Sequence, residues 1–257
     1  MIFTKLYIRI FKKIINALSV NKKTKYIGTE YGGWFILENT EIRDGVILSA
    51  GVGEDISFDI EMINNYGVKI IFVDPTPRAI KHISAIKNSL GNSKSKKFTT
   101  DGNQPVEAYN LENITEQDFS LITKALYNKS NLEVKFFSPP NDLHVSHSIS
   151  NWQNNYKKSG EHLNVKTTCV TDILNHENLK SVDMLKLDIE GAEIQVIPHI
   201  LKNKIYPNQL LVEFDELHDE SFKAYLKATY VFISLIFSGY KIINTKRYPN
   251  FLFEKIK

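Results

Sequence analysis

The sequence has one cysteine, Cys169, among 257 residues, and it lacks any long uninterrupted apolar run. A single cysteine excludes an intramolecular disulfide framework, so we expect a chain that is stabilised by packing and resides in the reducing cytoplasm. Charged residues interrupt each apolar run before the roughly 18 residues that a membrane-spanning helix requires. For the same reason the first residues do not resemble a secretory leader.

Several catalytic signatures are also absent. The chain contains no Gly-x-Ser-x-Gly turn, no Gly-Lys-Ser phosphate-binding loop and no pair of cysteines for zinc. These motifs position a serine nucleophile, a nucleotide phosphate and a bound metal, respectively. Their absence argues against serine hydrolases, P-loop kinases and cysteine-based zinc sites.

The basic residues are unevenly distributed. The formal net charge is +3, but the first 25 residues hold seven basic residues and no acidic one, which leaves −4 (3 minus 7) for the remainder. A mildly acidic body does not offer the basic surface that neutralises phosphates, so we expect no nucleic acid partner. The basic residues of the first segment are Lys5, Arg9, Lys12, Lys13, Lys22, Lys23 and Lys25.

Residues 1–25 are expected to form a basic amphipathic segment, separate from a single domain at 26–257. Apolar residues recur at helical spacing over residues 1–20, with Lys5 and Arg9 on the other side. Such a helix either lies on an anionic membrane surface, at the inner face of the membrane, or packs on its own domain or on a second subunit of a homodimer. Packing is the commoner use of the pattern, and both alternatives stay open from the sequence.

Apolar runs alternate with helical patterns along the chain. The runs at 46–50, 69–73, 182–187 and 210–214 are short, as buried strands are. Strands that alternate with helices predict a Rossmann-like α/β fold, that is, a doubly wound, mostly parallel sheet with helices on both faces and an antiparallel C-terminal strand. Residues 91–118 are polar and lack a period, so we expect an irregular segment. Further strands are expected at 119–123, 132–137, 240–244 and 251–256, and helices at 54–65, from 77, at 149–158, at 192–204 and at 221–237.

A loop with two glycines follows the strand at 46–50. In a doubly wound sheet this loop binds the nucleotide, because glycines let the backbone approach the ligand closely. Asp74 ends the next strand 21 residues after Gly53 (74 minus 53), close to the roughly 20-residue offset at which a carboxylate binds ribose hydroxyls. The predicted cofactor-binding residues are Ser49, Gly51, Gly53, Glu54 and Asp74.

Ile56 bears on the choice of nucleotide. A dinucleotide fingerprint has glycine or alanine at this position, where the helix packs closely beside the pyrophosphate. S-adenosylmethionine has no phosphate and tolerates isoleucine better, so a nicotinamide-dependent oxidoreductase is disfavoured. Ser49 and Asp55 depart from the common methyltransferase pattern, which has an acid and a third glycine at these positions.

Carboxylates gather after two of the predicted strands. Asp188 and Glu190 follow one buried strand, and Glu213 and Asp215 lie at the end of the next. Ligands bind at the carboxyl ends of such strands. The cluster predicts a divalent cation such as Mg²⁺, held by Asp188, Glu213 and Asp215. Helix capping and salt bridges are the simpler alternatives for these acids.

Two histidines, His144 and His147, lie in a predicted loop at 139–149. Histidine is the side chain best matched to proton transfer near neutral pH. Most loop histidines only form surface hydrogen bonds, so the loop alone does not identify a catalytic base. We expect His147 or Asp188 to be the base.

Six segments, in consistent order from about residue 30 to the C-terminus, resemble FkbM-type methyltransferases. The most specific is the block LKLDIEGAE at 185–193. The resemblance implies O-methylation with S-adenosylmethionine, commonly of sugars in glycans or of natural products. The other segments are YGGW at 31–34, LSAGVGEDISF at 48–58, FVDPTP at 72–77, HVSHS at 144–148 and LVEF at 211–214.

The resemblance also implies roles for single residues. By it, Gly51, Gly53 and Asp74 hold the cofactor. Asp188, Glu190 and the loop with His144 and His147 face the acceptor.

The predicted function is transfer of a methyl group to a hydroxyl of a sugar, a glycan or a related small molecule. The donor is already activated, so the protein chiefly aligns the reactants and removes the hydroxyl proton. The alternative is a non-catalytic adapter of the same fold in surface-glycan assembly, which the altered glycine loop favours. A DNA amino-methyltransferase is disfavoured, because Asp188 to Gly191 replace the Asn/Asp-Pro-Pro-aromatic motif.

Overall fold

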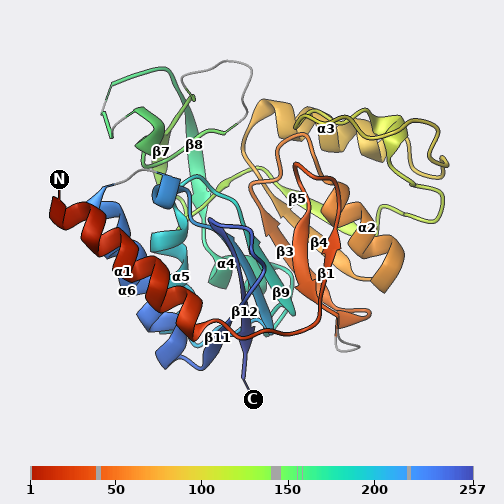
Figure 1. Ribbon diagram of the computed structural model, residues 1–257. Coiled ribbons are helices and arrows are strands. Elements are labelled where there is room, and N and C mark those ends of the chain that lie inside the picture. Colours follow the sequence, from red (N-terminus) through yellow and green to blue (C-terminus); the bar gives the residue numbers. More distant parts are fainter. Residues whose placement is uncertain are drawn as a thin grey trace.

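The computed structural model describes residues 2–38, 42–139, 146–154, 156–157, 159–218 and 221–256. A seven-stranded sheet forms its centre, in the order β11-β12-β10-β9-β3-β4-β5 (Figure 1). Of these strands, β12 runs antiparallel to its two neighbours and the remaining pairs are parallel. The Rossmann-like fold with an antiparallel C-terminal strand is therefore confirmed. The strands are β3 (Val46–Ala50), β4 (Lys69–Val73), β5 (Phe119–Ile122), β9 (Met184–Leu187), β10 (Gln209–Glu213), β11 (Tyr240–Ile243) and β12 (Asn250–Lys255).

Helices cover both faces of the sheet, because successive strand residues point to opposite sides. In β3, Leu48 and Ala50 belong to one apolar core and Ile47 to the other. The first core includes side chains of α1 (Ile2–Leu18), α4 (Val170–His176), α5 (Glu193–Lys202) and α6 (Phe222–Phe237). The second includes side chains of α2 (Ser57–Tyr66) and α3 (Pro77–Lys87).

Local chemistry sets where α2 and α3 begin. Thr76 caps α3, since its Oγ1 accepts a hydrogen bond from the Ala79 amide at 3.4 Å, and Pro77 occupies the first helical position. The helix expected from residue 54 begins only at Ser57. The Asp55 carboxylate accepts the Ser57 amide at 3.0 Å and so ends the loop there.

The predicted helix at 149–158 is wrong. In the described part of this segment only η3 (Trp152–Asn154) is helical, as a 3₁₀ turn. The Ser148 hydroxyl accepts the amides of Ser150 and Asn151 at 3.1 Å each, and Asn151 has a φ of 54°. These bonds compete with the helical pattern.

The strand expected at 132–137 exists as β7 (Glu133–Phe137) but lies outside the central sheet. It pairs with β8 (His162–Thr168), which also pairs with β6 (Ala125–Leu126). The irregular segment at 91–118 is confirmed, with the 3₁₀ turn η2 (Val106–Ala108) in it. The hairpin of β1 (Thr24–Ile27) and β2 (Trp34–Leu37) was not anticipated, and neither were β8 and α4.

The helix at the N-terminus packs on its own chain. Phe11 is buried and meets the rings of Tyr225 and Phe232 at centroid distances of 5.3 and 5.5 Å. Tyr7 hydrogen-bonds Thr229 at 2.8 Å, so α1 lies along α6 (Figure 1). Within the described residues, no helix combines the length and apolarity needed to cross a bilayer.

Candidate active site

A cavity of about 560 Å³ opens at the carboxyl ends of β3, β4, β9 and β10. The strand order reverses between β3 and β9, which is the switch point where open α/β sheets bind ligands. The cavity volume lies within the range of about 300–1,000 Å³ that is typical of small-molecule sites. The cavity walls come from the glycine loop, the ends of β4, β9 and β10, and two segments at 146–153 and 247–250.

The glycine loop touches the end of β9. Gly51 has a φ of 72°, and a Cβ atom there would lie 1.6 Å from the carbonyl oxygen of Asp188. No residue with a side chain fits this approach. The Lys186 ammonium donates to the Gly51 carbonyl at 3.3 Å and lies over the Trp34 ring, which joins the two strand ends further.

Asp74 lines the cavity, but its carboxylate is fully engaged. One oxygen accepts the amides of Val52 and Gly53 at 3.0 and 3.2 Å. The other accepts the amide and the hydroxyl of Thr76 at 2.8 and 2.6 Å. Since a carboxylate has about four acceptor positions, a ribose at Asp74 has to share or replace one of these bonds.

Two other predicted cofactor residues do not extend freely into the cavity. Ser49 is fully buried and is not among the lining residues, because it alternates with Leu48 and faces the side of the sheet covered by α2. Glu54 lines the cavity and forms an ion pair with Arg78 of α3. Asp55, at the position of the usual third glycine, instead accepts the Thr29 hydroxyl at 2.5 Å and the Ser57 amide.

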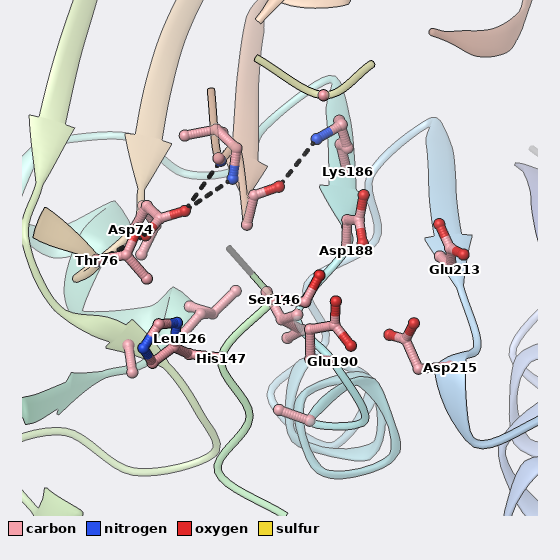
Figure 2. Close-up of a pocket in the computed structure, with 18 of the residues that line it drawn as sticks. Asp74, Thr76, Leu126, Ser146, His147, Lys186, Asp188, Glu190, Glu213 and Asp215 are labelled. Atoms are coloured by element: carbon pink, nitrogen blue, oxygen red, sulfur yellow. Dashed lines mark hydrogen bonds between the residues drawn. The ribbon is translucent and has the colours of Figure 1, made fainter. Parts of the chain in front are cut away.

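Four carboxylates gather on the other side of the cavity, as Figure 2 shows: Asp188, Glu190, Glu213 and Asp215. Burial raises the pKa of Asp188 well above its usual range, the charge of Glu213 adds to the shift, and Lys186 opposes it. Burial also raises the pKa of Asp215, and the neighbouring carboxylates, with Glu190 first, raise it further. Both shifts favour the uncharged form of these two carboxyl groups, because ionised carboxylates so close together repel one another.

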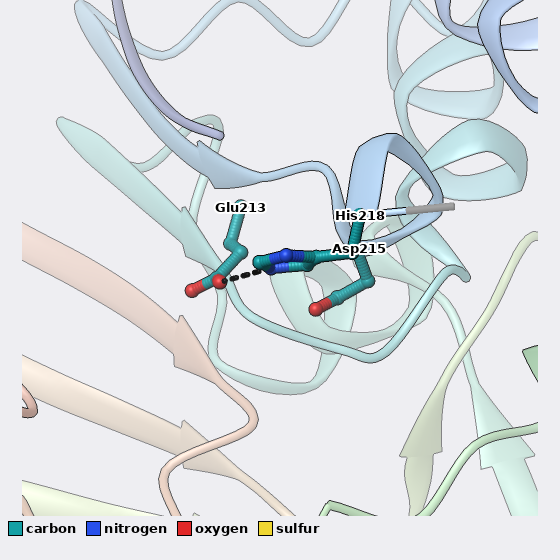
Figure 3. Close-up of side chains that lie close together, drawn as sticks. All are labelled: Glu213, Asp215 and His218. Atoms are coloured by element: carbon teal, nitrogen blue, oxygen red, sulfur yellow. Dashed lines mark hydrogen bonds and ion pairs between the residues drawn. The ribbon is translucent and has the colours of Figure 1, made fainter. Parts of the chain in front are cut away.

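Asp215 is the most deeply buried of these acids. It is 4% exposed, and among the described residues its Oδ2 has no hydrogen-bond partner. Its carboxylate lies within 4.8 Å of ligand atoms of two overlapping groups, Glu213 with His218 and Asp188 with Glu190. Figure 3 shows the first group, in which His218 Nε2 and Glu213 Oε1 are 3.5 Å apart. The Glu213 bond, ahead of other effects, raises the pKa of His218.

Glu190 and Glu193 are partly used by the protein itself. Glu190 accepts the Gln153 amide at 2.8 Å and has a φ of 56°, next to Gly191. Glu193 accepts the Ile189 amide at 2.9 Å, which holds the turn before α5. The N-cap of α5 is Ala192 and no side chain caps the helix, so neither Asp188 nor Glu190 has the capping role that the sequence allows.

Of the two predicted catalytic histidines, His147 lines the cavity and His144 lies outside the described residues. His147 stacks on Phe136 at a centroid distance of 5.6 Å, and its Nε2 is 3.4 Å from the Ser138 hydroxyl. In Figure 2 it lies on the side of Asp74 and Thr76, away from the carboxylates.

Several lining residues were not foreseen from the sequence. Trp152 stacks on His218 with an interplanar angle of 10°, and Gln153 holds Glu190. Asn250 donates to Glu213 at 3.1 Å, and Arg247 donates to the Glu30 carbonyl at 2.6 Å. Asn250 begins β12, and Trp152 and Gln153 lie in the segment that was expected to be a helix, but no motif in the sequence marks these positions as part of a site.

A comparison with family models identifies the family of the chain. The methyltransferase FkbM domain matches residues 37–241, which is most of the chain. The chain belongs to the FkbM methyltransferase family. The matched residues include the glycine loop, Asp74 and all four carboxylates of the cavity. No curated protein and no solved structure matches the chain.

Proposed function

We propose that this FkbM methyltransferase transfers the methyl group of S-adenosylmethionine to a hydroxyl of a sugar, a glycan or a related small molecule. The observation that carries the proposal is the division of one cavity. The glycine loop and Asp74 form one side, and Asp188, Glu190, Glu213 and Asp215 form the other.

The first side suits an adenosine-containing donor. Gly51 and Gly53 have positive φ values of 72° and 55°, which present loop backbone to the cavity without side chains. Asp74 offers a carboxylate at the position that binds ribose in doubly wound sheets. When the donor is bound, we expect a ribose hydroxyl to replace one of the loop amides as a hydrogen-bond donor to Asp74. Donor binding and the loop conformation are then coupled.

The second side suits an acceptor with several hydroxyls. Ionised carboxylates only accept hydrogen bonds, and hydroxyls are the donors that match them. Trp152 adds an aromatic wall beside Glu190 and His218. A sugar offers both hydroxyls and an apolar ring face.

The donor supplies an activated methyl group on a sulfonium. The protein has to align the acceptor oxygen with that methyl and take the hydroxyl proton as the new bond forms. We assign the proton to the Asp188 carboxylate, because Asp188 lies against the glycine loop and faces the other carboxylates. His147 lies on the donor side and is the less suitable base.

We also propose a divalent cation as a second cofactor, held by Glu213, Asp215 and His218 beside Asp188. The support is the orphaned, buried Asp215 Oδ2 within an oxygen-rich group of potential ligands. A cation there would neutralise charge and lower the pKa of a bound hydroxyl. Calorimetry with Mn²⁺ alone on EDTA-treated protein tests this. Asp215→Asn should weaken binding at least tenfold, whereas exposed Glu116→Gln should not.

Titration with S-adenosylmethionine and transfer of a labelled methyl group to glycan extracts test the function itself. We expect donor binding in the wild type, loss of transfer in Asp188→Asn, and donor affinity within a few-fold in that variant. A protein that binds no donor would support the adapter instead. Donor binding without Mn²⁺ binding would remove the cation and leave the methyltransferase standing.

A further inference from the structure

Exposed apolar side chains are concentrated on one pair of helices. In the described part of the chain, 15 large hydrophobic side chains are exposed, and 11 of them belong to α1 or α6. The two helices lie side by side (Figure 1). The exposed large hydrophobic side chains of these two helices form one surface, the α1/α6 apolar face.

On α1, the residues of this face are apolar but take no part in the packing of the helix on the domain. Tyr7, Ile8, Phe11 and Ile15 pack on the first core and on α6. At 3.6 residues per turn, the exposed members fall within an arc of about 120° beside that packed side. They are Phe3, Leu6, Ile10, Ile14 and Leu18, with exposed fractions between 46% and 85%.

The face continues onto α6. Phe222 is 48% exposed and also meets Tyr7 at a centroid distance of 4.9 Å, so the exposed residues of the two helices adjoin. The α6 members again fall within an arc of about 120°. They are Phe222, Leu226, Tyr230, Ile233, Ile236 and Phe237.

Basic residues border the face, and acids are absent from both helices. On α1, exposed Lys5, Arg9 and Lys13 lie on the side next to Leu6. On α6, Lys223 is exposed and lies at the edge of the arc. Viewed along the helix axis, it points in nearly the same direction as Tyr230. An apolar strip with a basic border is complementary to a surface that is apolar below and negative above, as a leaflet with anionic lipids is.

We propose that the α1/α6 apolar face docks this protein onto the surface of an anionic lipid bilayer. The helices lie in the plane of the interface, because neither is long and apolar enough to cross. A second copy fits the face less well. A two-fold interface would place the same basic border on both sides, with no acids in either helix to pair with it.

Vesicle co-flotation of the full chain tests the proposal. We expect binding to vesicles of phosphatidylcholine mixed with phosphatidylglycerol, and binding at least tenfold weaker to phosphatidylcholine alone. Leu6→Glu with Ile10→Glu should abolish binding, whereas Tyr206→Glu, an exposed aromatic outside the face, should not. Lys5→Gln with Arg9→Gln and Lys13→Gln should weaken binding to the anionic vesicles about 100-fold at low salt, at roughly 1 kcal/mol for each charge.

Light scattering and thermal unfolding accompany the test. All four proteins should be monomers with similar melting temperatures, so that a loss of binding is not a loss of folding. No binding to anionic vesicles overturns the proposal. A wild-type dimer that Leu6→Glu with Ile10→Glu dissociates also overturns it, because a second copy then covers the face. Equal binding to both kinds of vesicle overturns the preference for anionic lipids.

Discussion

Replacing Asp215 by asparagine should stabilise the metal-free protein. Asp215 is 4% exposed, its Oδ2 has no partner among the described residues, and the neighbouring carboxylates raise its pKa along with burial. Asparagine keeps the shape and removes the charge. A buried charged group without a partner costs about 1–3 kcal/mol or more, so we expect the free energy of unfolding to increase by an amount of that order.

The gain should grow with pH. Because the pKa of Asp215 is raised on folding, the folded chain retains a proton at pH values where the unfolded chain has lost it. The free energy of unfolding therefore falls as the pH rises from about 3.9, the ordinary aspartate value, through the raised folded pKa. The asparagine that replaces Asp215 does not titrate, so the difference between the two proteins widens toward alkaline pH.

The assay is thermal and chemical unfolding in EDTA at pH 5 and pH 8. A gain of about 1–3 kcal/mol corresponds to a melting temperature that rises by roughly 2–4 °C for each kcal/mol in a chain of this size. Glu116→Gln, at an exposed turn, should stay within about 0.5 kcal/mol at both pH values. Destabilisation by Asp215→Asn in EDTA, or a gain that is equal at both pH values, would refute the reasoning.

Metal should reverse the order of stability. If Mn²⁺ occupies the site, the wild type gains about 2.7 kcal/mol at 100 times the dissociation constant, and Asp215→Asn gains much less. A wild type whose melting temperature does not respond to Mn²⁺ would argue against the cation and leave the EDTA result unaffected.

Three further predictions concern packing and site geometry. Asp188→Asn should lower the methyl transfer rate about 10²–10⁴-fold in a steady-state assay with donor affinity retained, and a loss below tenfold would contradict its role as the base. Gly51→Ala should abolish donor binding in calorimetry and cost more than about 2 kcal/mol in urea unfolding, because its Cβ would lie 1.6 Å from a carbonyl oxygen. Gly91→Ala, with a φ of 84° but open space around it, controls for backbone strain alone. Phe11→Ala should cost about 3–5 kcal/mol, and Phe3→Ala, whose side chain is 85% exposed, less than about 0.5 kcal/mol. Similar costs for the two would show that α1 does not pack on α6.

Part of the site could be predicted because the sheet places it. Asp188 and Glu213 each stand at or just after the carboxyl end of a strand, and β9 and β10 are neighbours. Their meeting in one cavity follows from strand parallelism. The direction of the Ser49 side chain was also encoded, since Ser49 alternates with Leu48 and Ala50 along β3.

Other features of the fold and the site depend on contacts between residues that are distant in sequence. The predicted helix at 149–158 failed because Ser148 binds nearby amides and the Glu190 carbonyl, 42 residues away. The strand at 132–137 was located correctly, but its pairing with β8 outside the central sheet depends on long-range contacts. Trp152 and Asn250 line the cavity, although no motif in the sequence marks either residue.

By itself the sequence determined the layered α/β fold, the glycine loop with Asp74 and the carboxylates at the strand ends, because apolar runs, glycines and strand-end acids are local features with fixed consequences. Only the tertiary structure decided how those groups are satisfied. It engages Asp74 in four hydrogen bonds and leaves an Asp215 oxygen without a partner among the described residues. It also divides the apolar surface of α1 into a packed half and an exposed half. Whether a polar group finds a hydrogen-bond partner, and whether an apolar side chain is exposed, depends on which residues distant in sequence pack beside it. The spacing of residues along the chain does not contain that information.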